Sequence, residues 1–182
     1  MFLNVFASYN VRADAENEIM SETGVTTDLF RSAWSNYATG VTVISTIEAD
    51  GETVHGMTAN SVNSISLEPP LASITVGHER NTHPLVKRNG RFGLSVLAFD
   101  QRGIARHYTV PEEIRRTLSP PEFEPLGESM VLTNALAAMD CRVVDSFEAG
   151  DHTIFIAEVE SIRVNDGEPL LYFRSRFAAV ND

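Results

Sequence analysis

Two long β-type stretches joined by a tight turn constrain the fold of this chain more than any other feature. Residues Ala135–Phe147 and His152–Val164 are rich in β-branched and apolar side chains. The pair Gly150-Asp151 between them is typical of a hairpin turn. Strands joined by so short a turn pair antiparallel. The sequence therefore predicts a mainly β fold with a long antiparallel hairpin near its carboxyl end.

Further strands are predicted from other β-branched runs, and the predicted helices are short. About seven strands linked by hairpins indicate an antiparallel barrel or sandwich. A barrel of this size is either filled by side chains or holds a ligand at its rim. The other predicted strands are Val41–Glu48, Thr53–Met57, Leu71–Val76, Arg91–Leu97 and Leu170–Ala178, with Ser119–Gly127 as a loop. The predicted helices are Asp28–Ala38 capped by Thr27, Pro84–Arg88 capped by Thr82, Asp100–Tyr108, and Pro111–Arg116.

The length and composition indicate a single domain. A chain of 182 residues with 43% hydrophobic residues is long enough to bury a core of its own. The segment Ala13–Gly24 is polar and acidic. We expect residues 1–26 to form an N-terminal arm, either flexible or wrapped round a neighbouring subunit. Residues 27–182 form the predicted domain.

The charge and the cysteine content exclude several classes of function. The net charge is −11, from 25 acidic and 14 basic residues, so nucleic acids and anionic membranes would repel the chain. No apolar run approaches the ~20 residues of a membrane span, and the opening stretch lacks the basic leader of a signal peptide. Cys141 is the single cysteine and is interpreted as packing in an apolar strand rather than as a nucleophile. We expect a cytoplasmic protein without disulfides.

The stretch HGMTANSVNSISLEPPL, residues 55–71, carries many small hydrogen-bonding side chains and almost no charge. It begins like a strand, ends in a double proline and is followed by another apolar run. The hydroxyl, amide and backbone N–H groups of such a loop can hold an anion or the polar edge of a heteroaromatic ring. They can equally cap the loop's own backbone. Composition alone leaves both interpretations open.

Two further positions carry both a structural and a functional interpretation. Gly40, where the first helix meets a strand, either ends the helix or lets a flat ligand approach the backbone. His152 either caps its turn or points into a cleft as a hydrogen-bond donor. The other histidines show no metal-ligand spacing with one another or with Cys141, so no metal site is expected. The chain has no phosphate-binding glycine loop, nucleophile elbow or metalloprotease motif.

Five segments, taken together and in order, carry a resemblance to a known family. They read FRSAWSNYATGVTVIST, HGMTANSVNSISLEPPL, NGRFGLSVL, NALAAMDCRV and GDHTIFIAEVE…PLLYF. From about Leu29 to Phe177 the chain resembles the flavin reductase family, the short reductase component of two-component monooxygenases. The resemblance implies an antiparallel FMN-binding split β-barrel of Greek-key type with a few short flanking helices. It also implies a homodimer that uses FMN or FAD with NADH or NADPH and serves a flavin-dependent monooxygenase.

The resemblance places the ligands on particular residues of this chain. It implies that the flavin lies near a subunit interface and that His152, from the GDH motif, lies near the nicotinamide and orients its amide. The flavin ring and ribityl chain would be lined by Thr39, Gly40, Val41, Met57, Thr58, Ala59, Asn60 and Ser61. The same wall would continue through Ser64, Ile65 and Ser66, with Asn81, Thr82 and His83 near the phosphate end and Tyr172 as an aromatic near the site.

In this family the cofactors carry the chemistry, because hydride passes from the nicotinamide to the flavin. The protein has to hold the two rings at near-contact distance and exclude water. Neither a protein nucleophile nor a metal is needed for that reaction. The lack of a catalytic triad therefore agrees with the resemblance.

This chain departs from the family after Asp100–Tyr108, where HYTVPEEIRRTLSPP replaces an aromatic followed by small residues and a GDRF-like turn. Ser95 also stands where the family often has asparagine. Because the departing segment often covers the site, the choices between FMN and FAD and between NADH and NADPH stay open. Two other functions stay open as well: an oxidoreductase with a tightly bound flavin and another acceptor, and a non-catalytic flavin- or haem-binding protein.

Overall fold

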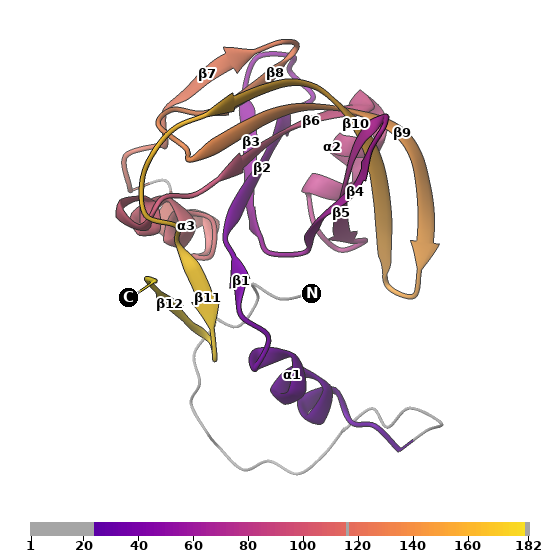
Figure 1. Ribbon diagram of the computed structural model, residues 1–182, viewed down its shortest axis with the longest axis vertical. Coiled ribbons are helices and arrows are strands. Elements are labelled where there is room, and N and C mark those ends of the chain that lie inside the picture. Colours follow the sequence, from indigo (N-terminus) through magenta and orange to yellow (C-terminus); the bar gives the residue numbers. More distant parts are fainter. Residues whose placement is uncertain (1–23, 116, 181–182) are drawn as a thin grey trace.

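The structure, a computed structural model, describes residues 24–115 and 117–180. They form a mainly β molecule in which antiparallel sheets are flanked by short helices (Figure 1). The predicted fold class, mainly antiparallel β with a few short helices, is confirmed. The predicted N-terminal arm, residues 1–26, lies outside the described residues except for its last three.

The largest element is a seven-stranded antiparallel sheet with the strand order β3-β2-β6-β9-β10-β5-β4. Two smaller sheets accompany it, one of β1, β11 and β12 and one of β7 and β8. The strands of the large sheet are β2 (Thr42–Ile47), β3 (Val54–Ala59), β4 (Val62–Leu67), β5 (Pro70–Gly77), β6 (Arg91–Val96), β9 (Ala137–Ala149) and β10 (His152–Val164). The others are β1 (Thr39–Gly40), β7 (Phe123–Leu126), β8 (Ser129–Leu132), β11 (Leu171–Phe173) and β12 (Arg176–Ala178).

The large sheet curls until the end of one edge strand lies beside the start of the other. Its edge strands, β3 and β4, are consecutive in the chain and are joined by only Asn60 and Ser61. Within the described residues no hydrogen-bonded ladder joins β3 to β4, so the sheet remains open between its two edge strands. The backbone groups on the free edge of β3 therefore remain available for other partners.

The predicted long hairpin is the centre of the large sheet. Strand β10 has the predicted bounds, and β9 begins and ends two residues later than expected. On its outer sides the hairpin pairs β9 with β6 and β10 with β5. The register sets His152 opposite both Ala149 and Gly77. The pairing at the hairpin turn therefore fixes the backbone position of His152.

Three expectations about irregular segments are wrong in detail. The stretch between the predicted strands Thr53–Met57 and Leu71–Val76 is not a loop, because β3 continues to Ala59 and β4 runs from Val62 to Leu67. Segment Ser119–Gly127 is not all loop, because it contains β7. Leu170–Ala178 is not one strand but a hairpin, turned at two residues with positive φ. Small polar residues have weak strand propensity, and pairing with β5 overrides it here.

Two apolar clusters stabilise the sheets. The first fills the curl of the large sheet and includes Ile44, Phe92 and Phe155, with Val86 contributed by helix α2. The second lies among β1, β2, α3 and the β11–β12 hairpin and includes Val41. Cys141 belongs to the first cluster, is fully buried and is a free thiol. Burial and the neighbouring Asp140 carboxylate raise the pKa of the Cys141 thiol to about 12.

The helices are short and differ in how they are anchored. Thr26, rather than Thr27, caps α1, because its hydroxyl accepts a hydrogen bond from Leu29 N (3.1 Å). Helix α1 ends at Ser35, and Gly40 belongs to β1 instead of ending the helix. None of these described helices has the length and apolar character to cross a membrane. The helices are α1 (Thr27–Ser35), α2 (Thr82–Asn89), the 3₁₀ turn η2 (Phe99–Gln101), α3 (Arg102–His107) and α4 (Glu112–Arg115).

A buried carboxylate fastens the β7–β8 hairpin to the large sheet. Asp140, on β9, is 2% exposed. It accepts hydrogen bonds from Arg91 Nη1 (2.5 Å) and Ser129 Oγ (2.6 Å). The backbone N–H of Glu128 donates a third (3.0 Å). Burial would raise the pKa of the Asp140 carboxyl, but these donors outweigh burial and hold the pKa below its ordinary value.

Replacing Asp140 with asparagine should lower the free energy of unfolding by about 3 kcal/mol at neutral pH, because half-buried Arg91 loses the most deeply buried of its three carboxylate partners. The stabilisation is complete above the ordinary carboxyl pKa of 3.8 and is lost as pH falls through the lower folded-state pKa. Wild type and variant should therefore converge in acid. Urea unfolding at a series of pH values measures both effects.

The control is Glu128→Gln, which removes an exposed carboxylate from the same guanidinium. That exposed pair should contribute less than about 1 kcal/mol. Equal losses in the two variants, or a gap that does not change with pH, would contradict the assigned role of Asp140.

Candidate functional site

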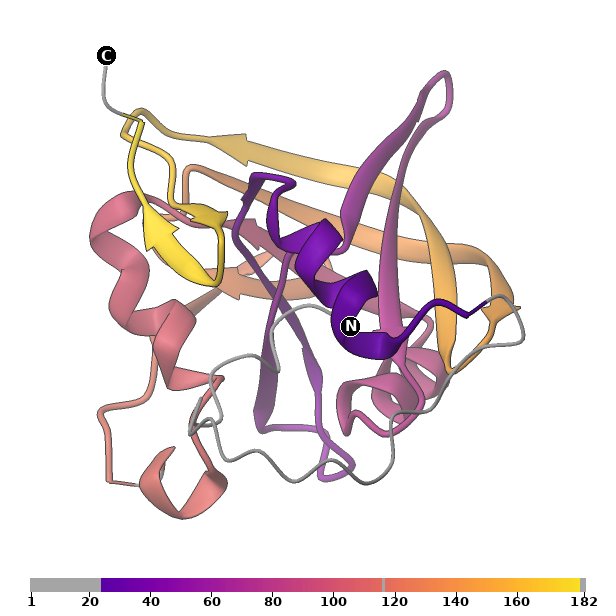
Figure 2. The same ribbon diagram turned by 90° about the horizontal axis from the view of Figure 1, so that it is seen from below.

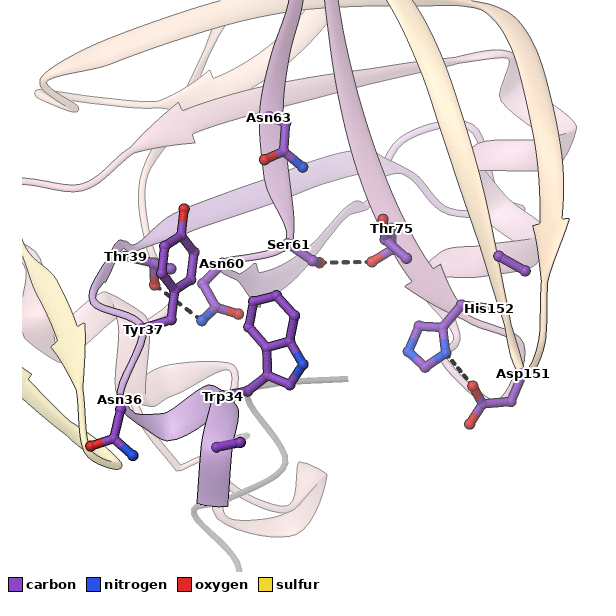
Figure 3. A pocket seen from close by; sticks show the side chains of 12 residues that line it. Trp34, Asn36, Tyr37, Thr39, Asn60, Ser61, Asn63, Thr75, Asp151 and His152 are labelled. Atoms are coloured by element: carbon purple, nitrogen blue, oxygen red, sulfur yellow. Dashed lines mark hydrogen bonds and ion pairs between the residues drawn. The ribbon is translucent and has the colours of Figure 1, made fainter. Parts of the chain in front are cut away.

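A pocket of about 790 Å³ lies between α1, the β3–β4 joint and the turn of the β9–β10 hairpin. Figure 3 shows Trp34, Tyr37 and Asn60 on one side of this pocket and His152 with Asp151 on the other. Its size is in the range of small-molecule and cofactor sites. The lining residues are Ala33, Trp34, Asn36, Tyr37, Thr39, Asn60, Ser61, Asn63, Thr75, Ala149, Asp151 and His152.

Helix α1 supplies an aromatic wall to the pocket. None of its residues is buried, and it lies away from the large sheet in Figure 1. Trp34 is 44% exposed and Tyr37 is 62% exposed. Their rings meet edge to face, with centroids 5.7 Å apart. Such exposed aromatic rings offer a flat apolar surface to a flat ligand.

The β3–β4 joint supplies uncharged hydrogen-bonding groups. The Asn60 amide donates to Thr39 Oγ1 (3.1 Å), which ties the joint to β1. Ser61 Oγ donates to the Thr75 carbonyl (2.8 Å), and Thr75 N donates back to the Ser61 carbonyl (3.0 Å). These bonds fix the joint against two strands while leaving the Asn60 carbonyl oxygen for other donors.

The turn of the β9–β10 hairpin supplies a histidine with a defined orientation. His152 is 9% exposed, and its Nδ1–H donates to Asp151 Oδ1 (2.6 Å). This hydrogen bond holds the pKa of the Asp151 carboxyl below its ordinary value. It also leaves Nε2 as the ring nitrogen for a ligand, on the pocket side of the ring in Figure 3. A Cβ at Gly77 would lie 3.4 Å from Nε2, so glycine keeps that space open.

Asp151 is the one charged side chain among the lining residues. The pocket therefore combines aromatic faces, amides, hydroxyls and one oriented imidazole. Among the described residues no hydroxyl or thiol hydrogen-bonds to His152 Nε2, so the pair Asp151–His152 has no nucleophile to activate for hydrolysis. Such a site suits a flat heteroaromatic ligand whose own atoms react.

The structure brings four of the expected site residues together in this pocket: Thr39, Asn60, Ser61 and His152. Tyr172 stands directly behind them, because it pairs with Thr39 in the β1–β11 register and is buried in the second apolar cluster. Gly40 is exposed, and a Cβ there would meet open space. Val41 is fully buried beside it.

The other expected residues lie outside the lining and have other partners. Thr58 is buried and its hydroxyl donates to the Ala105 carbonyl (2.9 Å). Residues Met57 and Ala59 pack in the first apolar cluster. Strand β4 carries Ser64, Ile65 and Ser66, with a bulge at Ile65, which is 50% exposed.

The segment expected at the phosphate end is divided among three surroundings. Asn81 precedes α2 and lines a second pocket. Thr82 is buried, with its hydroxyl 2.8 Å from His55 Nε2. His83 Nε2 lies 2.8 Å from Thr153 Oγ1. Burial and nearby His78 and Lys87 hold the pKa of His83 below its ordinary value. The ligand roles of these residues stay predictions.

Sequence reasoning missed several lining residues. In the predicted helix Asp28–Ala38, Trp34 and Tyr37 fall with Leu29 on one apolar face, a pattern typical of packing, but these side chains prove to be exposed. Asp151 was assigned to a turn, although it also orients His152. The sequence does contain signals for these residues. Trp34 and Tyr37 are two aromatic residues three positions apart, and Asp151 is an acid directly before a histidine. Asn36, Asn63 and Thr75 gave no such signal.

Comparisons with known proteins identify the family of this chain. The family model described as "Flavin reductase like domain" matches residues 34–181. An NADH-dependent flavin reductase of Rhodococcus sp is 34% identical over 155 residues, covering 82% of this chain and 84% of the relative.

Solved structures give the same result. The flavin reductase PheA2 in its native state superposes with a TM-score of 0.80 at 33% identity, covering 87% of this chain and 100% of that one. The styrene monooxygenase flavin reductase (SMOB) from Pseudomonas putida S12 gives 0.75 at 35% identity, covering 84% and 97%. The chain that places Thr39, Asn60 and His152 round one pocket belongs to the flavin reductase like domain family.

Proposed function

We propose that this protein is an NADH-dependent flavin reductase that reduces FMN or FAD and supplies the reduced flavin to a separate monooxygenase. One observation carries the proposal: residues from three separate segments line one pocket with an aromatic wall. They are Thr39, then Asn60 and Ser61, and then Asp151 and His152. Support also comes from the relatives, which are named as flavin reductases.

The pocket residues fit a flavin. An isoalloxazine ring has two flat faces and a polar edge of carbonyls and nitrogens. Trp34 and Tyr37 offer the surface for a face, and Asn60 with Ser61 offers amide, hydroxyl and backbone groups for the edge. The absence of a charged group on that wall suits a ring that carries none.

Bound flavin and nicotinamide would supply the hydride-transfer chemistry, and the chain would position them. The aromatic wall and the β3–β4 joint hold one ring and exclude water from its face. His152 acts at the opposite side, where Nε2 accepts a hydrogen bond from the nicotinamide carboxamide. Asp151 keeps His152 in the tautomer that leaves this nitrogen free.

NADH suits the pocket better than NADPH. The charged lining residue Asp151 is acidic and 88% exposed on its side chain, and no arginine or lysine is among the lining residues. A 2′-phosphate would find no cation on these walls and would be repelled by Asp151. The relative from Rhodococcus sp is named as NADH-dependent.

A homodimer would complete the site. Helix α1 exposes Leu29, Phe30 and Trp34, and Tyr37 is exposed just after it. Of these, Trp34 and Tyr37 line the pocket. A nine-residue helix without a buried face is marginal by itself in water. A second copy of the chain that covers this face would stabilise α1 and close the pocket, with residues 1–26 available to wrap the neighbour.

The first test is NADH oxidation by the purified protein with FMN, with FAD and without added flavin. Activity should require added flavin and saturate with it, because the open pocket exchanges its flavin with solution. Activity without added flavin would instead support a tightly bound flavin and another acceptor. Flavin binding without oxidation of NADH or NADPH would support a non-catalytic binding protein.

Replacing His152 with alanine should raise the Michaelis constant for NADH about tenfold through the lost hydrogen bond. The dissociation constant for flavin should change less than about twofold, since His152 lies on the opposite side of the pocket. Steady-state kinetics and flavin titration measure the two effects. The control is His78→Ala; His78 follows β5 and its backbone N–H donates to the Asp151 carbonyl, but it does not line the pocket. Unchanged NADH kinetics in His152→Ala would remove His152 from the site.

Replacing Leu29 with glutamate should convert the dimer to a monomer, because a charge would enter the apolar interface. The control Ser35→Glu adds the same charge to the side of α1 opposite the face of Leu29, Phe30 and Trp34 and should leave the dimer intact. Light scattering after size exclusion measures the mass of each. A wild-type monomer, or equal masses for all three proteins, would contradict the dimer.

A further inference from the structure

The chain has a net charge of −11, yet four arginines gather where α3 meets the β11–β12 hairpin. Arg102 and Arg106 lie on α3, and Arg174 and Arg176 lie on the hairpin. Figure 2 shows the yellow hairpin beside α3, and the second apolar cluster packs the two elements together. All four arginines are exposed. These four residues are named the arginine face.

The two segments that carry the arginine face contain no acidic residue. Residues 101–111 and 169–180 hold all four arginines and neither aspartate nor glutamate, although the whole chain has 25 acidic residues against 14 basic ones. The arginines on the sheets are placed differently, because Arg91, Arg142 and Arg163 each pair with a carboxylate. The local sequence therefore gives the arginine face a positive charge, against the overall sign of the chain.

Phenylalanine rings support three of these arginines. Arg106 reaches from α3 to Phe177 on β12, with its guanidinium carbon 6.0 Å from the centre of the ring. A ring beneath the flat side of a guanidinium restricts its motion and leaves its N–H edge for acceptors. Side chains held in this way lose less conformational freedom when they bind a carboxylate. The other two distances are 5.2 Å from Arg102 to Phe99 and 5.1 Å from Arg174 to Phe173.

The composition of the arginine face fits a contact with another protein. Arginine and aromatic residues are enriched in protein–protein interfaces and among the residues that dominate binding energy. A guanidinium binds a carboxylate through two parallel hydrogen bonds, so the matching surface is acidic. Nucleic acid also offers anions, but its charge continues along the whole strand and would be repelled by the rest of this chain. An acidic patch of limited size on a protein avoids that repulsion.

The arginine face begins at the rim of the large pocket. Arg174 Nε donates to Asn36 Oδ1 (3.1 Å), and Asn36 lines that pocket. The backbone N–H of Arg174 donates to the Ser35 carbonyl at the end of α1 (2.8 Å). Strand β11 pairs Tyr172 with Thr39, which also lines the pocket. A protein docked on the arginine face would therefore stand beside the pocket that the flavin leaves.

We propose that the arginine face docks an acidic surface of the monooxygenase that receives the reduced flavin. The proposal rests on the proposed reductase function for the identity of the partner, and on the exposed arginines for the chemistry of the contact. Opposite charges on the two surfaces would speed their encounter and fix their orientation. A partner held at the rim of the pocket would shorten the path of the reduced flavin and limit its exposure to dioxygen.

The test measures binding of a fluorescent peptide of consecutive glutamates, which stands in for the acidic surface. The double variant Arg106→Gln/Arg176→Gln removes two charges of the arginine face that do not line the large pocket. Loss of two charge-assisted contacts should weaken binding of the peptide about tenfold or more. Rising salt should weaken binding to wild type more than binding to the variant. A peptide of glutamines of equal length should not bind.

The control is Lys87→Gln/Arg88→Gln, which removes two charges from exposed positions on α2. Figures 1 and 2 both place α2 on the far side of the molecule from α3. This control should change peptide binding less than about twofold. The Michaelis constants for NADH and flavin should also change less than about twofold in both double variants, since none of the replaced residues lines the pocket. Thermal unfolding checks that both variants remain folded.

The possible results separate docking from the reductase function. No reduction of flavin by wild type would overturn that function and the monooxygenase as partner, whereas peptide binding separately tests the acidic contact. Absence of peptide binding to wild type, or equal binding to Arg106→Gln/Arg176→Gln, would overturn docking and leave the reductase function standing. Three other results would also overturn docking. Tighter binding of single-stranded DNA of equal charge would assign the face to nucleic acid, raised Michaelis constants in that variant would assign it to a substrate, and loss of its dimer would assign it to a second copy of the chain.

Discussion

The ladder between β9 and β10 is the interaction on which the rest of the structure depends. It runs from the pair His152–Ala149 at the turn to Val164–Ala137 at the open end. Each strand of this ribbon then pairs with one half of the large sheet. One end carries Asp151 and His152 into the ligand pocket, and the middle of β9 carries Asp140 to the β7–β8 hairpin. The histidine is therefore positioned by the most extensively paired part of the molecule.

Sequence periodicity predicted the parts of the fold that local chemistry determines. The long hairpin, the strands at 41–48 and 91–97 and the helix over 84–88 all have local signals, and the structure confirms them. Strand β4 was missed because serine and asparagine favour loops, and only its partner β5 makes it a strand. The sequence predicts one strand over Leu170–Ala178 because the turn inside it, at Arg174 and Ser175, contains no glycine.

The candidate site was predicted only where the sequence carries a motif. Thr39, Asn60, Ser61 and His152 lie together in one pocket. The order of three motifs along the chain suggests that they share a site, but it does not give their arrangement in space. Trp34 was assigned to packing because an apolar helix face normally packs on a core. Contacts between distant segments are what a single sequence leaves undetermined.

The single cysteine gives this fold a chemical property suited to its chemistry. Reduced flavin that is not passed on reacts with dioxygen and yields hydrogen peroxide, which attacks thiolates and spares thiols. Cys141 is fully buried, and its pKa of about 12 keeps it protonated. Asp140, which fastens the hairpin, adds to that shift through its negative charge. The charge that holds two sheets together thus also lowers the reactivity of this cysteine towards the oxidant that reduced flavin forms.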